Sequence, residues 1–338
     1  MPKKALKAGK LDIAFLNRIL DKLQIKDKRV RIGPKIGEDA AVIEMKDQYL
    51  VAASDPVTFV SDDIGYYVVH VNANDIAVRG AVPKWFLATL LLPEKNSSEE
   101  TVLKIFSQIE KASKKLNISL VGGHTEIVSG IDRPIVSGHM IGEVDKDMLI
   151  TTGGAKKGNK LILTKGICIE GVSIIAREKS KDLIKKGFSH NTLKRARNFI
   201  YNPGISVVKE ALLATKKEGI TCMHDPTEGG LAMGCYEIAK AADVGMVVFE
   251  EKIPVLKEAG IMCKEYRLNP LGTIASGALL MTAKAGKAER ILSILEKNSI
   301  KADLIGEIRD KKEGVMLQGK KRQKKMPYFI RDEITRIF

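Results

Sequence analysis

The sequence predicts a two-domain protein of the α/β or α+β class. Short apolar segments that suit buried strands alternate with segments whose apolar residues recur at helical spacing. The 338 residues are enough for two domains of ordinary size, and 44% hydrophobic residues can form a sizeable core. Composition becomes glycine-rich and basic at residues 151–159, so we place the domain boundary there, between residues 1–150 and 151–338.

The elements of the first half follow from apolar spacing, glycines and capping residues. A Ser97–Glu100 pair has the spacing of a capping box and predicts the start of a helix. In chain order we expect a helix at 11–24, a flexible loop at 29–46, a strand at 49–53 closed by Asp55, a helix at 68–78, a strand at 86–92, a helix at 101–116, a buried strand at 118–121 and a strand at 134–144.

The second half continues the alternation of strands and helices. A glycine-rich turn at 224–230 is expected to open a helix that reaches residue 242. The other predicted elements are a strand at 160–164, a helix near 172–178, a basic helical stretch, a helix at 206–217, strands at 245–249 and 277–282, a helix at 288–298 and a strand at 302–308.

The net charge of +15 favours anionic partners, either nucleic acid, anionic membranes or phosphorylated small molecules. Much of the excess lies in terminal runs, at Lys3, Lys4, Lys7 and Lys10 and at residues 320–325, with few aromatic residues nearby. We therefore expect small molecules rather than nucleic acid. The longest apolar stretches are far too short to span a bilayer, and no secretory h-region follows the basic start. A cytoplasmic protein with four free cysteines and no membrane partner is expected.

Acidic residues recur at the ends of apolar strands or in the turns beside them, at Asp39, Asp55, Asp75, Glu126 and Asp225. Magnesium prefers oxygen ligands and usually takes one or two carboxylates together with phosphate oxygens. Carboxylates repel a polyphosphate, so several acids beside glycines predict a site in which cations bridge the acids to a triphosphate. Any single acid has an equally good alternative as a turn-capping residue, and the prediction depends on their joint occurrence.

Four segments resemble motifs of one superfamily, and they occur in the expected order. Residues 37–41 resemble its GDDAAV segment, 72–81 its N-x-x-D-x-A-x-x-G-A helix, 122–125 its GG[DE]T motif and 225–231 its D-x-T-x-G-G-L motif. From about residue 30 to about residue 310 the chain thus resembles the PurM-like (aminoimidazole-ribotide synthetase related) superfamily. The hydrogenase maturation HypE-like branch is the nearest match.

This resemblance implies an N-terminal domain that contributes strands to a β-barrel shared by a homodimer, and a C-terminal α/β domain. ATP would bind with magnesium, or manganese, and a small-molecule substrate would accept the phosphate. The implied metal ligands are Asp39, Asp55, Asp75 and Asp225. We add Glu126, which lies two positions after the place where the family has an acid. The implied nucleotide contacts are Gly37, Asn74, Gly122, Gly123, Thr125, Thr227, Gly229 and Gly230.

Asp75, Arg79 and His124 are the residues that we expect to act in catalysis. Arg79 follows the metal-binding helix and either neutralises the transferring phosphate or faces solvent. His124 stands where the family has an acid, so either Glu126 replaces that acid, or the metal count differs, or manganese is used, or His124 only hydrogen-bonds beside the site.

The chain also departs from the HypE-like pattern at two other places. Its last cysteine is Cys263, so the C-terminal cysteine of that branch is absent, and Ser276 stands where the branch has an acid. We therefore expect an ATP-dependent, magnesium-requiring phosphotransferase with an unidentified acceptor. The alternatives are a metal-dependent phosphatase acting on phosphate esters, with water as the acceptor, and a non-catalytic nucleotide-binding regulator.

Overall fold

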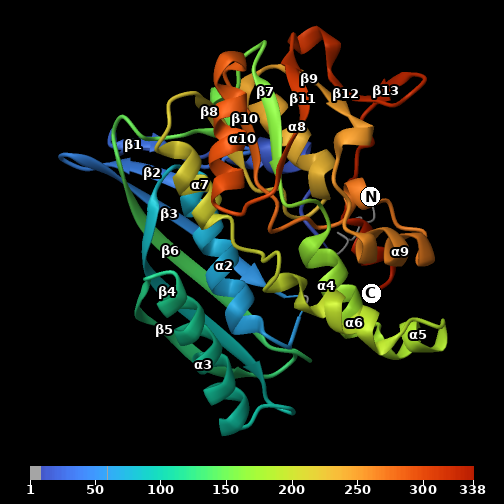
Figure 1. Cartoon of the computed structure of the whole chain (residues 1–338). Coiled ribbons are helices and arrows are strands. Elements are labelled where there is room, and N and C mark those ends of the chain that lie inside the picture. Colours follow the sequence, from blue (N-terminus) through green and yellow to red (C-terminus); the bar gives the residue numbers. More distant parts are fainter. Residues whose placement is uncertain (1–8, 59) are drawn as a thin grey trace, which may run out of the picture.

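Two open sheets of mixed strand direction, each with helices packed on it, make up the computed structural model, which describes residues 9–58 and 60–338 (Figure 1). The first sheet uses strands between Val30 and Asp145, and the second uses strands between Lys160 and Lys325. The predicted mixed α/β class is therefore confirmed. Lys3, Lys4 and Lys7 of the basic N-terminal run lie outside the described residues.

The first sheet has six strands, and its neighbours are antiparallel except for the parallel pair β4–β5. In spatial order the strands are β1 (Val30–Ile32), β2 (Ala41–Glu44), β3 (Gln48–Val57), β6 (Ile135–Asp145), β4 (Val82–Pro93) and β5 (Ser119–Val128).

Helices α2 (Ile64–Ala77) and α3 (Glu99–Lys115) lie side by side over this sheet (Figure 1). Every second residue of β6, such as Val136 and Met140, is fully buried, whereas the residues between them are only half-buried. One face of the sheet thus forms the core with the helices, as strand alternation requires. Helix α2 is buried along almost its whole length.

Several predicted boundaries in the first half are wrong. The N-cap of α3 is Ser98, whose hydroxyl accepts from the Thr101 amide, and not Ser97. The loop predicted at 29–46 contains β1 and β2, and β3 continues past Asp55 to Val57. Strand β5 does not stop at the glycines and is exposed along nearly all of its length instead of buried. The first helix, α1 (Ile13–Leu20), is shorter than predicted.

The second sheet has seven strands, of which, among the described residues, only β12 and β9 pair in parallel. Its spatial order is β13 (Gln323–Lys325), β12 (Val315–Gln318), β9 (Gly245–Phe249), β11 (Ala302–Arg309), β7 (Lys160–Thr164), β10 (Leu280–Ala283) and β8 (Ile220–His224). Strands β8, β12 and β13 were not predicted. β13 consists of exposed polar residues and carries no apolar signal.

The helices of the second half are α4 (Ile169–Glu178), α5 (Ser180–Lys185), α6 (His190–Arg197), α7 (Val208–Thr215), α8 (Gly230–Ala242), α9 (Lys257–Glu265) and α10 (Ala288–Lys297). Helices α4, α7, α8 and α10 begin and end close to the predicted positions, α5 and α6 fall in the predicted basic helical stretch, and α9 was not predicted. Helices α7 and α10 pack together beside the second sheet (Figure 1). Across residues 9–58 and 60–338, every helix is too short or too polar to cross a membrane.

Helix α2 connects the two halves through buried polar contacts. The Asn74 side chain donates to the Ile205 carbonyl at 2.9 Å and accepts from the Val207 amide at 2.8 Å. The Tyr66 hydroxyl, on the same helix, donates to the Ile200 carbonyl at 3.1 Å. These bonds fix the second half relative to the helix that carries Asp75.

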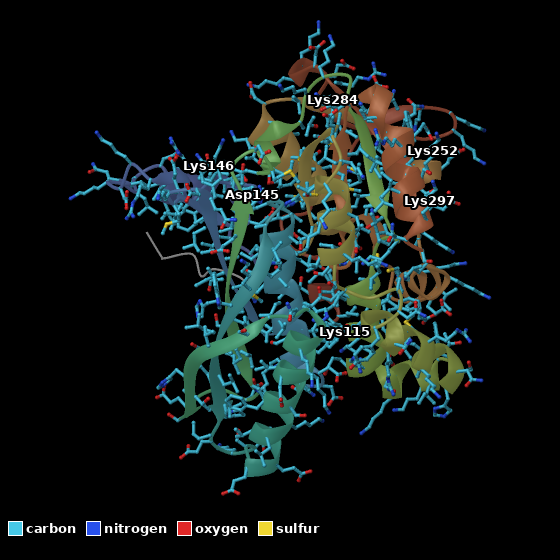
Figure 2. The ribbon with its side chains drawn as sticks, turned by 60° about the vertical axis from the view of Figure 1, so that its left-hand side comes forward. Lys115, Asp145, Lys146, Lys252, Lys284 and Lys297 are labelled. Carbon is cyan, nitrogen blue, oxygen red and sulfur yellow. The ribbon has the colours of Figure 1, made fainter. Side chains whose placement is uncertain are left out.

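The basic charge is spread over the surface. Figure 2 shows Lys115, Lys146, Lys252, Lys284 and Lys297 at separate places on the molecule. Some of the charge is also paired, since Lys146 forms an ion pair of 2.7 Å with Glu44. The expectation that nucleic acid is not a partner stays a prediction.

Candidate functional site

A cavity of about 390 Å³ lies where residues of the two halves meet. It is lined on one side by residues of the first half and on the other by the turn before α8 and a C-terminal segment. Six residues that the sequence predicted for the site line it, namely Gly37, Asp39, Asp55, Asp75, Thr227 and Gly229.

The predicted acids reach this region from four different elements. Asp39 precedes β2, Asp55 lies in β3, Asp75 lies near the end of α2, and Asp225 directly follows β8. Asn72 fixes the backbone beside Asp55, because its Oδ1 accepts from the Asp55 amide at 2.9 Å and its Nδ2 donates to the Asp55 carbonyl at 3.1 Å. Helix α2 therefore both carries Asp75 and positions Asp55.

Arg79 holds the segment that carries Asp39. Its fully buried guanidinium forms ion pairs with Glu38 and, at 2.9 Å, with Oδ2 of Asp39, and it donates to Thr152 Oγ1 at 2.7 Å. The alternative that Arg79 faces solvent is therefore wrong. Because both of its terminal nitrogens donate to protein groups, the structure gives Arg79 a positioning role, and only its Nε lacks a partner among the described residues.

His224 is a second buried cation beside Asp39, and we did not predict a role for it. Its Nδ1 donates to Asp39 Oδ2 at 2.9 Å, and its Nε2 donates to Glu237 Oε2 at 2.8 Å. Burial lowers the pKa of His224, but the charges and hydrogen bonds of Asp39 and Glu237 outweigh burial and raise it to about 10. Both nitrogens of His224 thus face carboxylates that favour its charged form.

Asp225 has the features of a cation ligand. Both of its carboxylate oxygens are buried without a hydrogen-bond partner among the described residues. One of them lies within 4.8 Å of an Asp39 oxygen and a His224 nitrogen. Leaving a buried carboxylate unpaired is costly, so this geometry fits a divalent cation held by Asp225 and Asp39.

The electrostatics of the acids agree with such a cation. Burial raises the pKa of Asp75 well above its ordinary value, and the negative charges of Asp55 and Asp225 raise it further. Burial likewise raises the pKa of Asp225, with a further contribution from Asp39. In Asp39, by contrast, the nearby charges of His224 and Arg79 outweigh burial and hold the pKa below its ordinary value. A bound cation would stabilise all of these acids in the ionised form.

Lys10 supplies a cation at the mouth of the cavity. Its Nζ donates to Thr227 Oγ1 at 3.0 Å, and its backbone amide donates to Glu228 at 3.2 Å. Lys10 as a whole is exposed, but its ammonium group is surrounded by protein, and this burial alone would lower the pKa of Lys10. The negative charges of nearby carboxylates, led by Glu237 and Glu228, have the larger effect and raise the pKa. Lys10 and Lys35 both line the cavity.

Three predicted nucleotide contacts are already hydrogen-bonded within the protein. The Gly229 amide donates to Asp332 Oδ2 at 2.7 Å, and the Gly230 amide donates to the Thr227 carbonyl at 3.0 Å. The amides of Gly229 and Gly230 are therefore already engaged within the protein. The Asn74 amide is likewise engaged by the second half, as described above.

The GGHTE segment lies apart from the acids of its own chain. Gly122, Gly123, His124, Thr125 and Glu126 are exposed on the edge strand β5, and none of them lines the cavity. His124 only approaches Glu126, at 3.6 Å on the exposed surface.

The pairing of strands in the first sheet shows how far Gly123 lies from Asp55. Asp55 pairs with Gly138, Gly138 with Ala88, and Ala88 with Gly123. Three strand spacings amount to about 14 Å, so Gly123 is too far from Asp55 to share a metal ion with it.

Comparison with known proteins finds two domains of one family along the chain. Residues 37–144 match the AIR synthase related protein, N-terminal domain, and residues 156–318 match its C-terminal domain. A putative hydrogenase expression/formation protein of Methanocaldococcus jannaschii is 30% identical over 309 residues, covering 89% of this chain and 88% of that protein. A carbamoyl dehydratase HypE of Cupriavidus necator is 27% identical over 273 residues, covering 80% and 73% of the two chains.

More distant relatives include a thiamine-monophosphate kinase of Pyrococcus horikoshii, 26% identical over 243 residues, with coverage of 68% and 71%. Among solved structures, hydrogenase maturation protein HypE in complex with ATP superposes with a TM-score of 0.72 at 21% identity, covering 90% of this chain and 92% of that chain. Since the two domain matches lie in order along both halves and the first relative is similar over most of both chains, this protein belongs to the AIR synthase related family, the PurM-like family that includes the HypE proteins.

Proposed function

We propose that this protein is an ATP-dependent, magnesium-requiring phosphotransferase whose acceptor is a small molecule. The observation that carries the proposal is the convergence of Asp39, Asp55, Asp75 and Asp225 from four elements on one region, with both Asp225 oxygens buried and unpaired. Two relatives, a carbamoyl dehydratase and a thiamine-monophosphate kinase, are ATP-dependent enzymes, and they support an ATP-dependent reaction for this protein.

In this proposal Asp39 and Asp225 hold a divalent cation, and Asp55 and Asp75 complete the acidic lining. Magnesium, or manganese, would supply positive charge that neutralises the phosphates. Lys10 and Lys35, which also line the cavity, would bind phosphate oxygens. Arg79 and His224 would act indirectly, because they fix Asp39 in its ionised form.

We further propose that the chain forms a homodimer through the first sheet, closing it into a shared barrel. Strand β5 supports this, since it is a ten-residue edge strand with exposed apolar residues at Leu120, Val121 and Ile127. Long exposed edges of this kind are normally covered by a partner strand. In such a dimer, residues 122–126 would lie in the interface, and any contact they make with nucleotide would require the second copy. The division into domains at residues 150 and 151 is retained as part of the proposal.

The test is ATP binding and turnover by the purified protein with magnesium, with manganese and with EDTA. The proposal expects metal-dependent nucleotide binding and slow formation of ADP that an acceptor accelerates. Phosphate release from simple phosphate esters without ATP would instead identify a metal-dependent phosphatase. Tight, metal-dependent ATP binding without turnover under any acceptor screened would identify a nucleotide-binding regulator. Absence of nucleotide binding in either metal would refute the proposed function.

A further inference from the structure

A second cavity of about 350 Å³ adjoins the first one. The two share lining residues at Lys10, Asp55, Thr227 and Glu228. A phosphate held in the first cavity would therefore lie next to the opening of the second. The volume suits a small organic molecule.

Two buried polar side chains line this second cavity without a hydrogen-bond partner. Glu170, in the first turn of α4, is 7% exposed, and Ser276 is 1% exposed. Oε2 of Glu170 and Oγ of Ser276 have no hydrogen-bond partner of good geometry among the described residues, although the Ser276 hydroxyl lies near enough to Glu170 to lower the pKa of its carboxyl group. Buried polar atoms are rarely left unpaired in native proteins, so these two atoms indicate a ligand that donates hydrogen bonds.

The charges around Glu170 determine whether a cationic or an anionic ligand is favoured. Within the described lining residues, Lys10 is the one cationic side chain, and its Nζ donates to Thr227 Oγ1 at 3.0 Å rather than to Glu170. Burial raises the pKa of Glu170 to about 7, and the negative charges of Asp332 and Glu228 contribute to the increase. An anion would be repelled here, whereas a cation would gain a charge-assisted hydrogen bond.

The remaining wall suits a hydrocarbon body. It is formed by branched aliphatic side chains at Val57, Val60, Val71, Ile174 and Ile274. A ligand with a cationic head and an apolar body would therefore match both ends of the cavity.

We propose that this second cavity binds the acceptor as a small organic cation, with an amine, amidinium or guanidinium group that donates hydrogen bonds to Glu170 and Ser276. The assignment of the ligand as the acceptor rests on the proposed phosphotransferase function, whereas the binding of a cation does not.

Three probes with the same ring and different heads test this inference, namely cationic benzamidine, neutral benzamide and anionic benzoate. Calorimetric titration at pH 8 of the full chain, with magnesium and a non-hydrolysable ATP analogue present, should show benzamidine binding about tenfold or more tightly than the other two. Glu170→Gln should weaken benzamidine binding by about 10- to 100-fold, and Ser276→Ala by less. Glu178→Gln, at the exposed end of the same helix, removes an equal charge and should leave the affinity unchanged.

Two results would overturn the inference. One is equal binding of the three probes, or binding of none of them. The other is an unchanged benzamidine affinity in Glu170→Gln when its melting temperature shows that it is folded.

A titration of Asp75→Asn separates this inference from the proposed function. Benzamidine binding that persists in this variant, where nucleotide binding should be weakened, supports the cation site whatever becomes of the phosphotransferase proposal. Conversely, wild-type protein that turns over ATP but does not discriminate benzamidine from benzamide overturns the cation site alone.

Discussion

His224 donates from Nδ1 to Oδ2 of Asp39 at 2.9 Å, joining residues 185 positions apart in the chain. Arg79 donates to the same oxygen at 2.9 Å, so two cations share one carboxylate oxygen. The other oxygen, Oδ1, is then the one that we expect to bind a metal ion. Some residues of the site, such as Arg79 and His224, thus hold the acids in place, whereas other groups remain free to bind a ligand. Asp225 is the clearest example of a free acid, because both of its oxygens lack a partner in the described part of the chain.

Asp75→Asn should lower the affinity for nucleotide in magnesium by about tenfold or more while leaving the protein as stable as the wild type or more so. The substitution removes a carboxylate from the metal site, and burial has already raised the pKa of that carboxylate well above its ordinary value. Calorimetry with ATP and magnesium measures the affinity, and thermal unfolding measures the stability. Asp47→Asn, at an exposed turn, is the control. Unchanged nucleotide affinity in Asp75→Asn would show that Asp75 has no part in binding.

Arg79→Met should destabilise the protein by about 3–5 kcal/mol, because it leaves Glu38 without its buried partner and Asp39 with His224 alone. The free energy of unfolding in urea measures the loss. Arg29→Met breaks an exposed ion pair with Asp27 and should cost far less, because solvent screens that pair. A loss in Arg79→Met no larger than that in Arg29→Met would mean that the buried cluster does not depend on its arginine.

The sequence predicted the parts of the site that are local in the chain. Asn74 and Asp75 are poor helix formers inside a helix, and this conflict correctly indicated a tertiary requirement at that point. Asp39, Asp55 and Asp225 could be grouped because each belongs to a motif with glycines or strand ends around it.

Contacts between distant residues left no such signal. His224 and Glu237 act on Asp39 across nearly 200 residues, and Asp332 occupies the Gly229 amide from a segment with no motif. The exposure of β5 was missed for a similar reason. Apolar residues at 118–121 suit a buried strand, and only the strand order shows that this one lies at an edge.

Val121→Lys should weaken the proposed dimer and shift the molecular mass in solution towards that of one chain. The lysine would place a charge on an exposed apolar residue of the edge strand, where a partner strand would otherwise bury it. Light scattering after size-exclusion chromatography measures the mass over a range of concentrations. Leu103→Lys replaces an exposed leucine on α3 and should not alter the mass. A wild-type protein that is monomeric at all concentrations would rule the dimer out.

Glu170→Gln should make the ligand-free protein more stable than the wild type at pH 8, with little difference at pH 4.5. The pKa of Glu170 is raised to about 7 in the folded state, against an ordinary value of 4.5, so the folded state holds this proton more tightly than the unfolded state does. The Glu170 contribution to stability is therefore present at low pH and is lost as pH rises from 4.5 through 7.

Above pH 7 the wild type carries a buried charge that glutamine does not, and we expect a difference on the order of 1–3 kcal/mol, seen as an increase of several degrees in melting temperature. Melting curves of both proteins from pH 4.5 to pH 8.5 measure it, with Glu178→Gln as the exposed control on the same helix. Because the expected difference grows only between about pH 4.5 and 7 and then levels off, a constant offset across the whole range would show that Glu170 has an ordinary pKa in the folded protein.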